Sequence, residues 1–140
     1  MDRCDLSTPA GQAEAIAITI RREISLLFDE QVPDWHCRVF YQLLHYADPL
    51  QEVFHHAVIG PESDTIIELI QRIQPAVDAT RAFQYLFLII APLTLHVDYR
   101  AAVLTRIGEQ HYPQTYIDEL SRLCIRQALF LLNLPQRSSE

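Results

Sequence analysis

At 140 residues, 49% hydrophobic and 21% charged, the chain has the size and composition of one globular domain. Its net charge is −7 and all 11 basic residues are scattered arginines, which excludes a P-loop lysine and a clustered basic surface for nucleic acid. Three widely spaced cysteines, without a Cys-x-x-Cys pair, indicate reduced thiols in a cytoplasmic protein: Cys4, Cys37 and Cys124.

No targeting or membrane segment is expected. The first residues carry charges without an apolar core, unlike a signal peptide. The most apolar run, Tyr85–Leu95, is about 11 residues long and is interrupted by Pro92, whereas a membrane span needs roughly 20. We therefore expect a soluble chain with no membrane partner.

Apolar residues three and four positions apart predict helices along the first half of the chain. The first is predicted over about Pro9–Glu30, because a hydroxyl cap at Ser7-Thr8 precedes proline in the first turn. A second is predicted over about Asp34–Tyr46. A third begins near Pro49, and Gly60-Pro61 indicates a kink or a break after it.

The second half of the chain continues the helical pattern, with predicted helices over about Glu62–Ile73, Ala79–Leu95, Asp98–Gln110 and Pro113–Leu134. Asp78 caps the second of these, which is apolar nearly all round and must therefore be covered on several sides. No segment alternates with period two for long enough to predict a strand. The prediction is one all-α domain over residues 1–140, with six to seven helices.

Several segments together resemble the C-terminal effector domain of TetR-type transcriptional regulators. They are Trp35–Gln42, Asp48–Leu50 with Val53-Phe54, Arg81–Leu95 and Pro113–Leu132. The resemblance covers about Thr8–Leu134 and implies an orthogonal or up-down helix bundle that homodimerises and binds a small apolar or amphipathic effector. The family's helix-turn-helix segment has no counterpart in the chain, so we expect this chain not to bind nucleic acid directly.

Aromatic residues are concentrated in the predicted middle helices. Ligand pockets between helices are mostly apolar, with a few polar groups that fix orientation. The expected ligand-binding residues are Trp35, Phe40, Tyr41, Leu44, Phe54, Phe83, Phe87 and His96. The alternative is that these aromatic side chains only fill the core.

The two long apolar helices of the second half are expected to form a four-helix dimer interface, since the first has more apolar surface than one neighbour covers. The expected interface residues are Phe87, Ile90, Leu120, Leu123, Gln127 and Leu131. Arg126 and Glu119 are expected to pair across the symmetry axis. The alternative is that both helices belong to the core of a monomer.

Signals for catalysis or metal binding are weak. Glu52 and His55 have the Glu-x-x-His spacing of helical di-iron sites, but those sites need two such motifs and further carboxylates. No zinc spacing and no nucleophile motif occurs, and Cys124 falls on the apolar stripe of its helix. We expect no catalytic residues, no metal and no cofactor, hence no enzyme. A ligand-free helical adaptor and, less favoured, a small metal-binding enzyme remain as alternatives.

Overall fold

The computed structural model describes residues 4–28, 52–53, 56–57 and 60–136, and the regular elements with defined bounds there are α-helices. They are α1 (Pro9–Leu27), α4 (Gly60–Ile73), α5 (Ala79–Asp98), α6 (Arg100–Ile107) and α7 (Gln114–Leu131). No strand occurs in this part of the chain, so the predicted all-α class is confirmed. The helix predicted over Asp34–Tyr46 lies outside the described residues.

Local capping explains where two of the long helices, α1 and α5, begin. The Thr8 hydroxyl accepts a hydrogen bond from the Gly11 amide at 3.1 Å, and Pro9 occupies the first position of α1, as predicted. The Asp78 carboxylate accepts from the Arg81 amide at 2.8 Å at the start of α5. In both cases a side-chain oxygen satisfies an amide that has no partner within the helix.

The predicted helix boundaries differ from the observed ones by up to three residues, and two of the differences have a clear cause or consequence. Gly60 and Pro61 form the first turn of α4, whose predicted start was Glu62, because a proline in the first turn needs no amide hydrogen. Helix α5 continues three residues past Leu95 to Asp98. Within the described residues, this helix of 20 residues has the length and hydropathy of a membrane span. The apolar run Tyr85–Leu95 in the sequence is too short to predict a helix of that kind.

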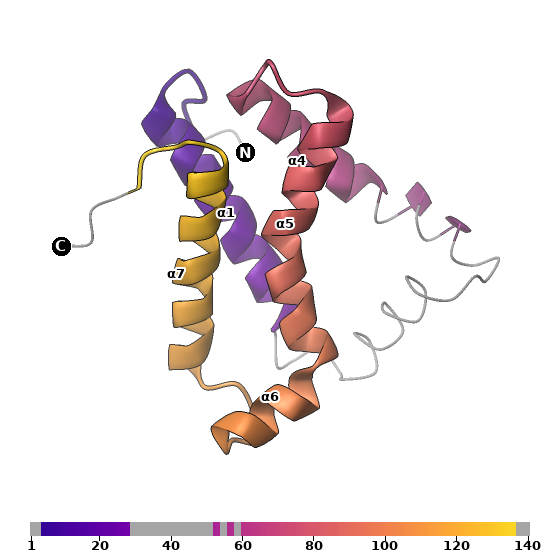
Figure 1. The fold of residues 1–140 in the computed structure, drawn as a ribbon, viewed down its shortest axis with the longest axis vertical. Helices are drawn as coiled ribbons and strands as arrows, with labels where there is room; N and C mark the ends of the chain where they lie inside the picture. Colours follow the sequence, from indigo (N-terminus) through magenta and orange to yellow (C-terminus); the bar gives the residue numbers. More distant parts are fainter. Residues whose placement is uncertain (1–3, 29–51, 54–55, 58–59, 137–140) are drawn as a thin grey trace.

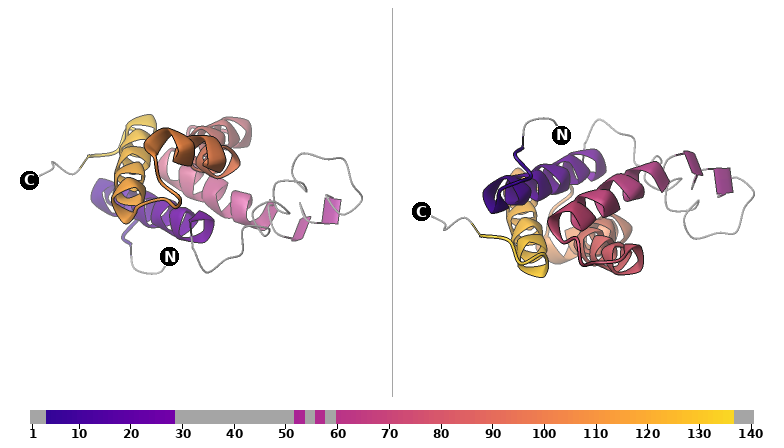
Figure 2. Two further views of the ribbon diagram at one scale, coloured as in Figure 1. Left: turned by 90° about the horizontal axis from the view of Figure 1, so that it is seen from below. Right: turned by 90° about the horizontal axis from the view of Figure 1, so that it is seen from above.

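The helices form two layers. Helix α4 packs against α5, while α1 packs against both α7 and α5. Helix α6 lies across one end of α5 and α7 (Figure 1). Seen along the long axis, α1 and α4 lie on one side and α5 and α7 on the other (Figure 2). The outer sides of α5 and α7 are thus turned away from the other described long helices.

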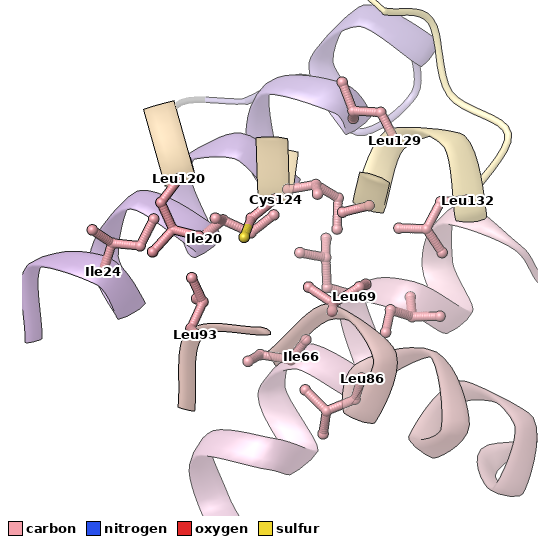
Figure 3. Close-up of a cluster of buried hydrophobic side chains, with 14 of the residues drawn as sticks. Ile20, Ile24, Ile66, Leu69, Leu86, Leu93, Leu120, Cys124, Leu129 and Leu132 are labelled. Carbon is pink, nitrogen blue, oxygen red and sulfur yellow. The ribbon is translucent and has the colours of Figure 1, made fainter. Parts of the chain in front are cut away.

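The core lies between these layers. Side chains from α1, α4, α5 and α7 converge there, and those exposed by 1% or less include Ile20, Leu69, Ile70, Leu93 and Leu132 (Figure 3). Cys124 belongs to the same cluster with 4% exposure, and burial raises the pKa of its thiol. This side chain is therefore part of the packed core, as predicted.

Glu23 on α1 supports a prediction about pH. Burial raises the pKa of its carboxyl group, Glu62 raises it further, and Arg22 acts in the opposite direction. Since the folded state binds this proton more tightly than the unfolded state, stability falls as pH rises from the ordinary value of 4.5 through the raised pKa. We expect Glu23→Gln to raise the melting temperature at pH 7, with a smaller gain at pH 4.

Circular dichroism melts of both proteins at the two pH values measure this difference. Glu68→Gln, which replaces an exposed carboxylate on α4 in the same way, is the matched control. A gain from Glu23→Gln that is equal at both pH values would contradict the assignment to ionisation.

Candidate functional site

The outer side of α5 carries large apolar side chains. Ala82, Leu86, Ile89 and Leu93 recur three and four residues apart and are buried in the core. The opposite side of the helix exposes Phe83, Phe87, Leu88 and Leu95, with exposed fractions between 47% and 63%. A helix that is apolar on both its buried and its outer side has more apolar surface than its described neighbours cover.

Helix α7 extends this surface. Its residues Leu123 and Phe130 are 48% and 76% exposed, and Gln127 lies exposed between them in sequence. The two helices are joined by a hydrogen bond from Gln127 Nε2 to the Leu88 carbonyl at 3.2 Å. We call the resulting surface the apolar face, formed by Phe83, Phe87, Leu88, Leu95, Leu123 and Phe130.

The residues predicted for a dimer interface divide into three groups. Phe87, Leu123 and Gln127 are exposed on the outer sides of α5 and α7. Ile90 and Leu131 are half-buried. Leu120 is only 7% exposed and packs in the core of the protomer, so the structure does not offer it to a partner. Sequence reasoning missed Leu88, Leu95 and Phe130, although the apolar character of α5 on every side pointed to the first two.

The ion pair predicted between Arg126 and Glu119 would join two protomers, and within one protomer Glu119 pairs with Arg122. Both Nε and an NH group of Arg122 donate to the Glu119 carboxylate, one turn away on α7, with Nε–Oε2 at 2.8 Å. This bidentate pair lowers the pKa of the exposed Glu119 carboxyl.

His96 links the C-terminal end of α5 to the N-terminal end of α7. Its Nδ1 lies 2.6 Å from the Pro92 carbonyl, and its Nε2 lies 3.0 Å from the Tyr116 hydroxyl. The first contact requires a proton on Nδ1, so in the neutral ring Nε2 accepts from Tyr116. The Tyr112 hydroxyl donates to the His96 carbonyl, and burial, followed by the neighbouring Tyr116, raises the pKa of Tyr112.

This geometry bears on the predicted ligand-binding residues. Both ring nitrogens of His96 have partners inside the protomer, and Phe83 and Phe87 lie on the outer surface with ring centroids 5.6 Å apart. The other predicted ligand residues, Trp35, Phe40, Tyr41, Leu44 and Phe54, lie outside the described residues. Among the described members of the set, His96 is therefore bonded inside the protomer while Phe83 and Phe87 lie on the outer surface.

Two open hollows, of about 600 and 800 Å³, lie along α1 and α7. They share Arg21, Asp118 and Ser121, and the first has an apolar floor that includes Ala17 and Ile125. Neither hollow is lined by Phe83, Phe87 or His96. They are grooves between packed helices rather than the pocket expected from the sequence.

Metal ligation has no assembled group in the described part of the chain: no three His, Cys, Asp or Glu side chains come together there. Of the Glu-x-x-His pair, Glu52 is exposed and His55 lies outside the described residues.

Comparison of the chain with protein-family models, with curated proteins and with solved structures finds no match in any of the three. We therefore infer the function from the chain's own residues. The inference starts from the apolar face, because its large apolar side chains are exposed.

Proposed function

We propose that this chain is a regulatory domain of the TetR type, which pairs with a second copy of itself through the apolar face and binds a small apolar or amphipathic effector. The observation that carries the proposal is the apolar face: six large side chains, each at least 47% exposed, on two adjacent helices. Contiguous apolar surface of this kind marks interaction sites in soluble proteins.

Aromatic and aliphatic side chains of this size supply most of the binding energy in protein interfaces. Removing apolar surface from water stabilises a complex by roughly 25 cal/mol per Å² before the entropic cost of association. Phe87 and Phe130, exposed by 63% and 76%, are the largest contributors on α5 and α7 respectively. A partner that covers both helices together would thus gain most.

The distribution of charge around the apolar face favours a second copy as this partner. Helices α5 and α7 run antiparallel, since Leu88 lies against Gln127 and His96 against Tyr116. Arg81 and Arg126 are therefore toward one end and Asp98 toward the other, all exposed, while Glu119 near Asp98 is already paired with Arg122. A two-fold axis perpendicular to the helices would bring Arg81 and Arg126 of one protomer toward Asp98 and the Glu119–Arg122 pair of its partner, which is the arrangement proposed for the interface.

The effector part of the proposal is supported by the aromatic residues of the segment Trp35–Phe54, whose composition suits an apolar pocket with few polar groups. Pairing and effector binding would be linked if the effector binds one arrangement of the dimer more tightly than another. In this role the chain would carry out no catalysis and make no direct contact with nucleic acid.

Native mass spectrometry tests both parts in one experiment. We expect the purified chain to have the mass of two copies plus a constant small excess from the effector. Leu123→Asp, which places a carboxylate at the centre of the apolar face, should weaken pairing by more than about a hundredfold, because burying an unpaired charge costs several kcal/mol.

The matched control is Ile18→Asp on α1. Ile18 has a similar exposed fraction, 44% against 48% for Leu123, but lies outside the apolar face. This variant should remain a dimer. A monomeric wild-type chain, or equal effects of the two variants, would refute pairing through the apolar face, and a stable complex with a different helical protein would favour the adaptor alternative. Two copies with no excess mass would leave the dimer and remove the support for a bound effector.

A further inference from the structure

Pro92 interrupts the main-chain hydrogen bonding of α5, which continues through it from Ala79 to Asp98. In a regular helix the amide at position 92 would donate to the carbonyl of Leu88, four residues earlier. Proline has no amide hydrogen, and its ring also crowds that carbonyl. The Leu88 carbonyl therefore needs a donor from elsewhere.

That donor comes from α7. Gln127 Nε2 lies 3.2 Å from the Leu88 carbonyl oxygen and donates to it, across 39 positions of sequence. A side-chain amide of one helix thus replaces the main-chain amide that the other helix lacks. The contact lies where Leu88 of α5 meets α7, within the apolar face.

Other side chains hold the rest of α5. The His96 ring contacts the Pro92 carbonyl and the Tyr116 hydroxyl, and the Tyr112 hydroxyl donates to the His96 carbonyl. These contacts fix the part of α5 that follows Pro92. Gln127 contacts the turn of α5 that precedes Pro92. Residues of α7 and of the segment before it therefore contact α5 on both the N-terminal and the C-terminal side of the proline.

We propose that Pro92 and Gln127 act as a coupled pair: the proline frees the Leu88 carbonyl, and the glutamine amide binds it and sets the position of α5 against α7. The pair is a conformational device that keeps Leu88 and Leu95 on one continuous surface with Leu123. Its effect on pairing between copies rests on the proposed function, whereas its effect on the stability of the protomer does not.

A double-mutant cycle tests the coupling. Gln127→Met keeps the length of the side chain and removes the donor. In the wild-type background it should raise the equilibrium constant of unfolding about five-fold, the effect of one hydrogen bond. In the Pro92→Ala background the new main-chain amide can donate to Leu88, so the same change should have less than about a two-fold effect.

Urea denaturation of the full chain, followed by circular dichroism, gives the four equilibrium constants. Gln110→Met, in the exposed segment between α6 and α7, is the control and should have no effect in either background. The cycle is measured again with Leu123→Asp present, where pairing through the apolar face is abolished. Coupling in that background supports the pair even if the wild-type chain proves monomeric. If the effects of Gln127→Met and Pro92→Ala are additive both with and without Leu123→Asp, the coupled pair is overturned, even if the chain is a dimer.

Discussion

Leu93→Ala is expected to lower the free energy of unfolding by about 3 to 4 kcal/mol, the largest effect of any single substitution considered. Leu93 is fully buried on α5, facing side chains from α1 and α4 such as Ile20 and Ile66 (Figure 3). Alanine would leave a cavity there, because close-packed neighbours collapse only partly into vacated space.

Urea denaturation measures this loss. Leu26→Ala removes the same atoms from a side chain on α1 that is 53% exposed, and should change the stability by less than about 1 kcal/mol. Similar losses from the two variants would show that Leu93 is not in a close-packed core.

Gly11→Ala is expected to destabilise the protein by about 1 to 3 kcal/mol, although alanine favours helices elsewhere. A Cβ atom at position 11 would lie 2.0 Å from the main-chain oxygen of Asp5. That oxygen accepts hydrogen bonds from the amide and the hydroxyl of Thr8, so it cannot move without disrupting the cap of α1. The segment before α1, including the partly buried Leu6, would have to shift away from the helix.

Denaturation combined with thiol labelling tests this account. Cys4 is partly buried beside the core in the wild-type structure, so its labelling rate should rise in the Gly11→Ala variant while that of the buried Cys124 stays low. Gly108→Ala is the control, since a Cβ there meets open space and the strain comes only from a φ of 76°. Unchanged labelling of Cys4 would contradict the predicted shift.

Much of the helical layout could be predicted, because its signals are local. The Thr8 cap and the spacing of Ile16, Ile20 and Ile24 predict α1 to within three residues of its observed end. The end of α5 was missed by the same three residues, in the other direction, because the contacts of His96 with Tyr116 and of its carbonyl with Tyr112 come from residues far along the chain. Apolar periodicity does not indicate such contacts.

The candidate site was harder to predict for a geometric reason. Leu120 and Leu123 lie on the same broad apolar stripe of α7, yet one is buried and the other is 48% exposed. Which side of the stripe faces inward depends on how α1 and α5 cross α7, and the sequence of α7 does not contain that information. The contact of Gln127 had one usable signal, since a proline inside a predicted helix always frees a carbonyl four residues earlier.

The packing of α1 against α7 has a consequence for synthesis of the chain. The main partner of the apolar side of α1, which carries Ile20 and Ile24, is a helix that begins at Gln114. Until the ribosome has synthesised α7, the apolar side of α1 lacks this partner and is exposed to other nascent chains and to chaperones. The domain must therefore close in a late step that joins its two distant ends, which slows folding relative to helix pairs adjacent in sequence.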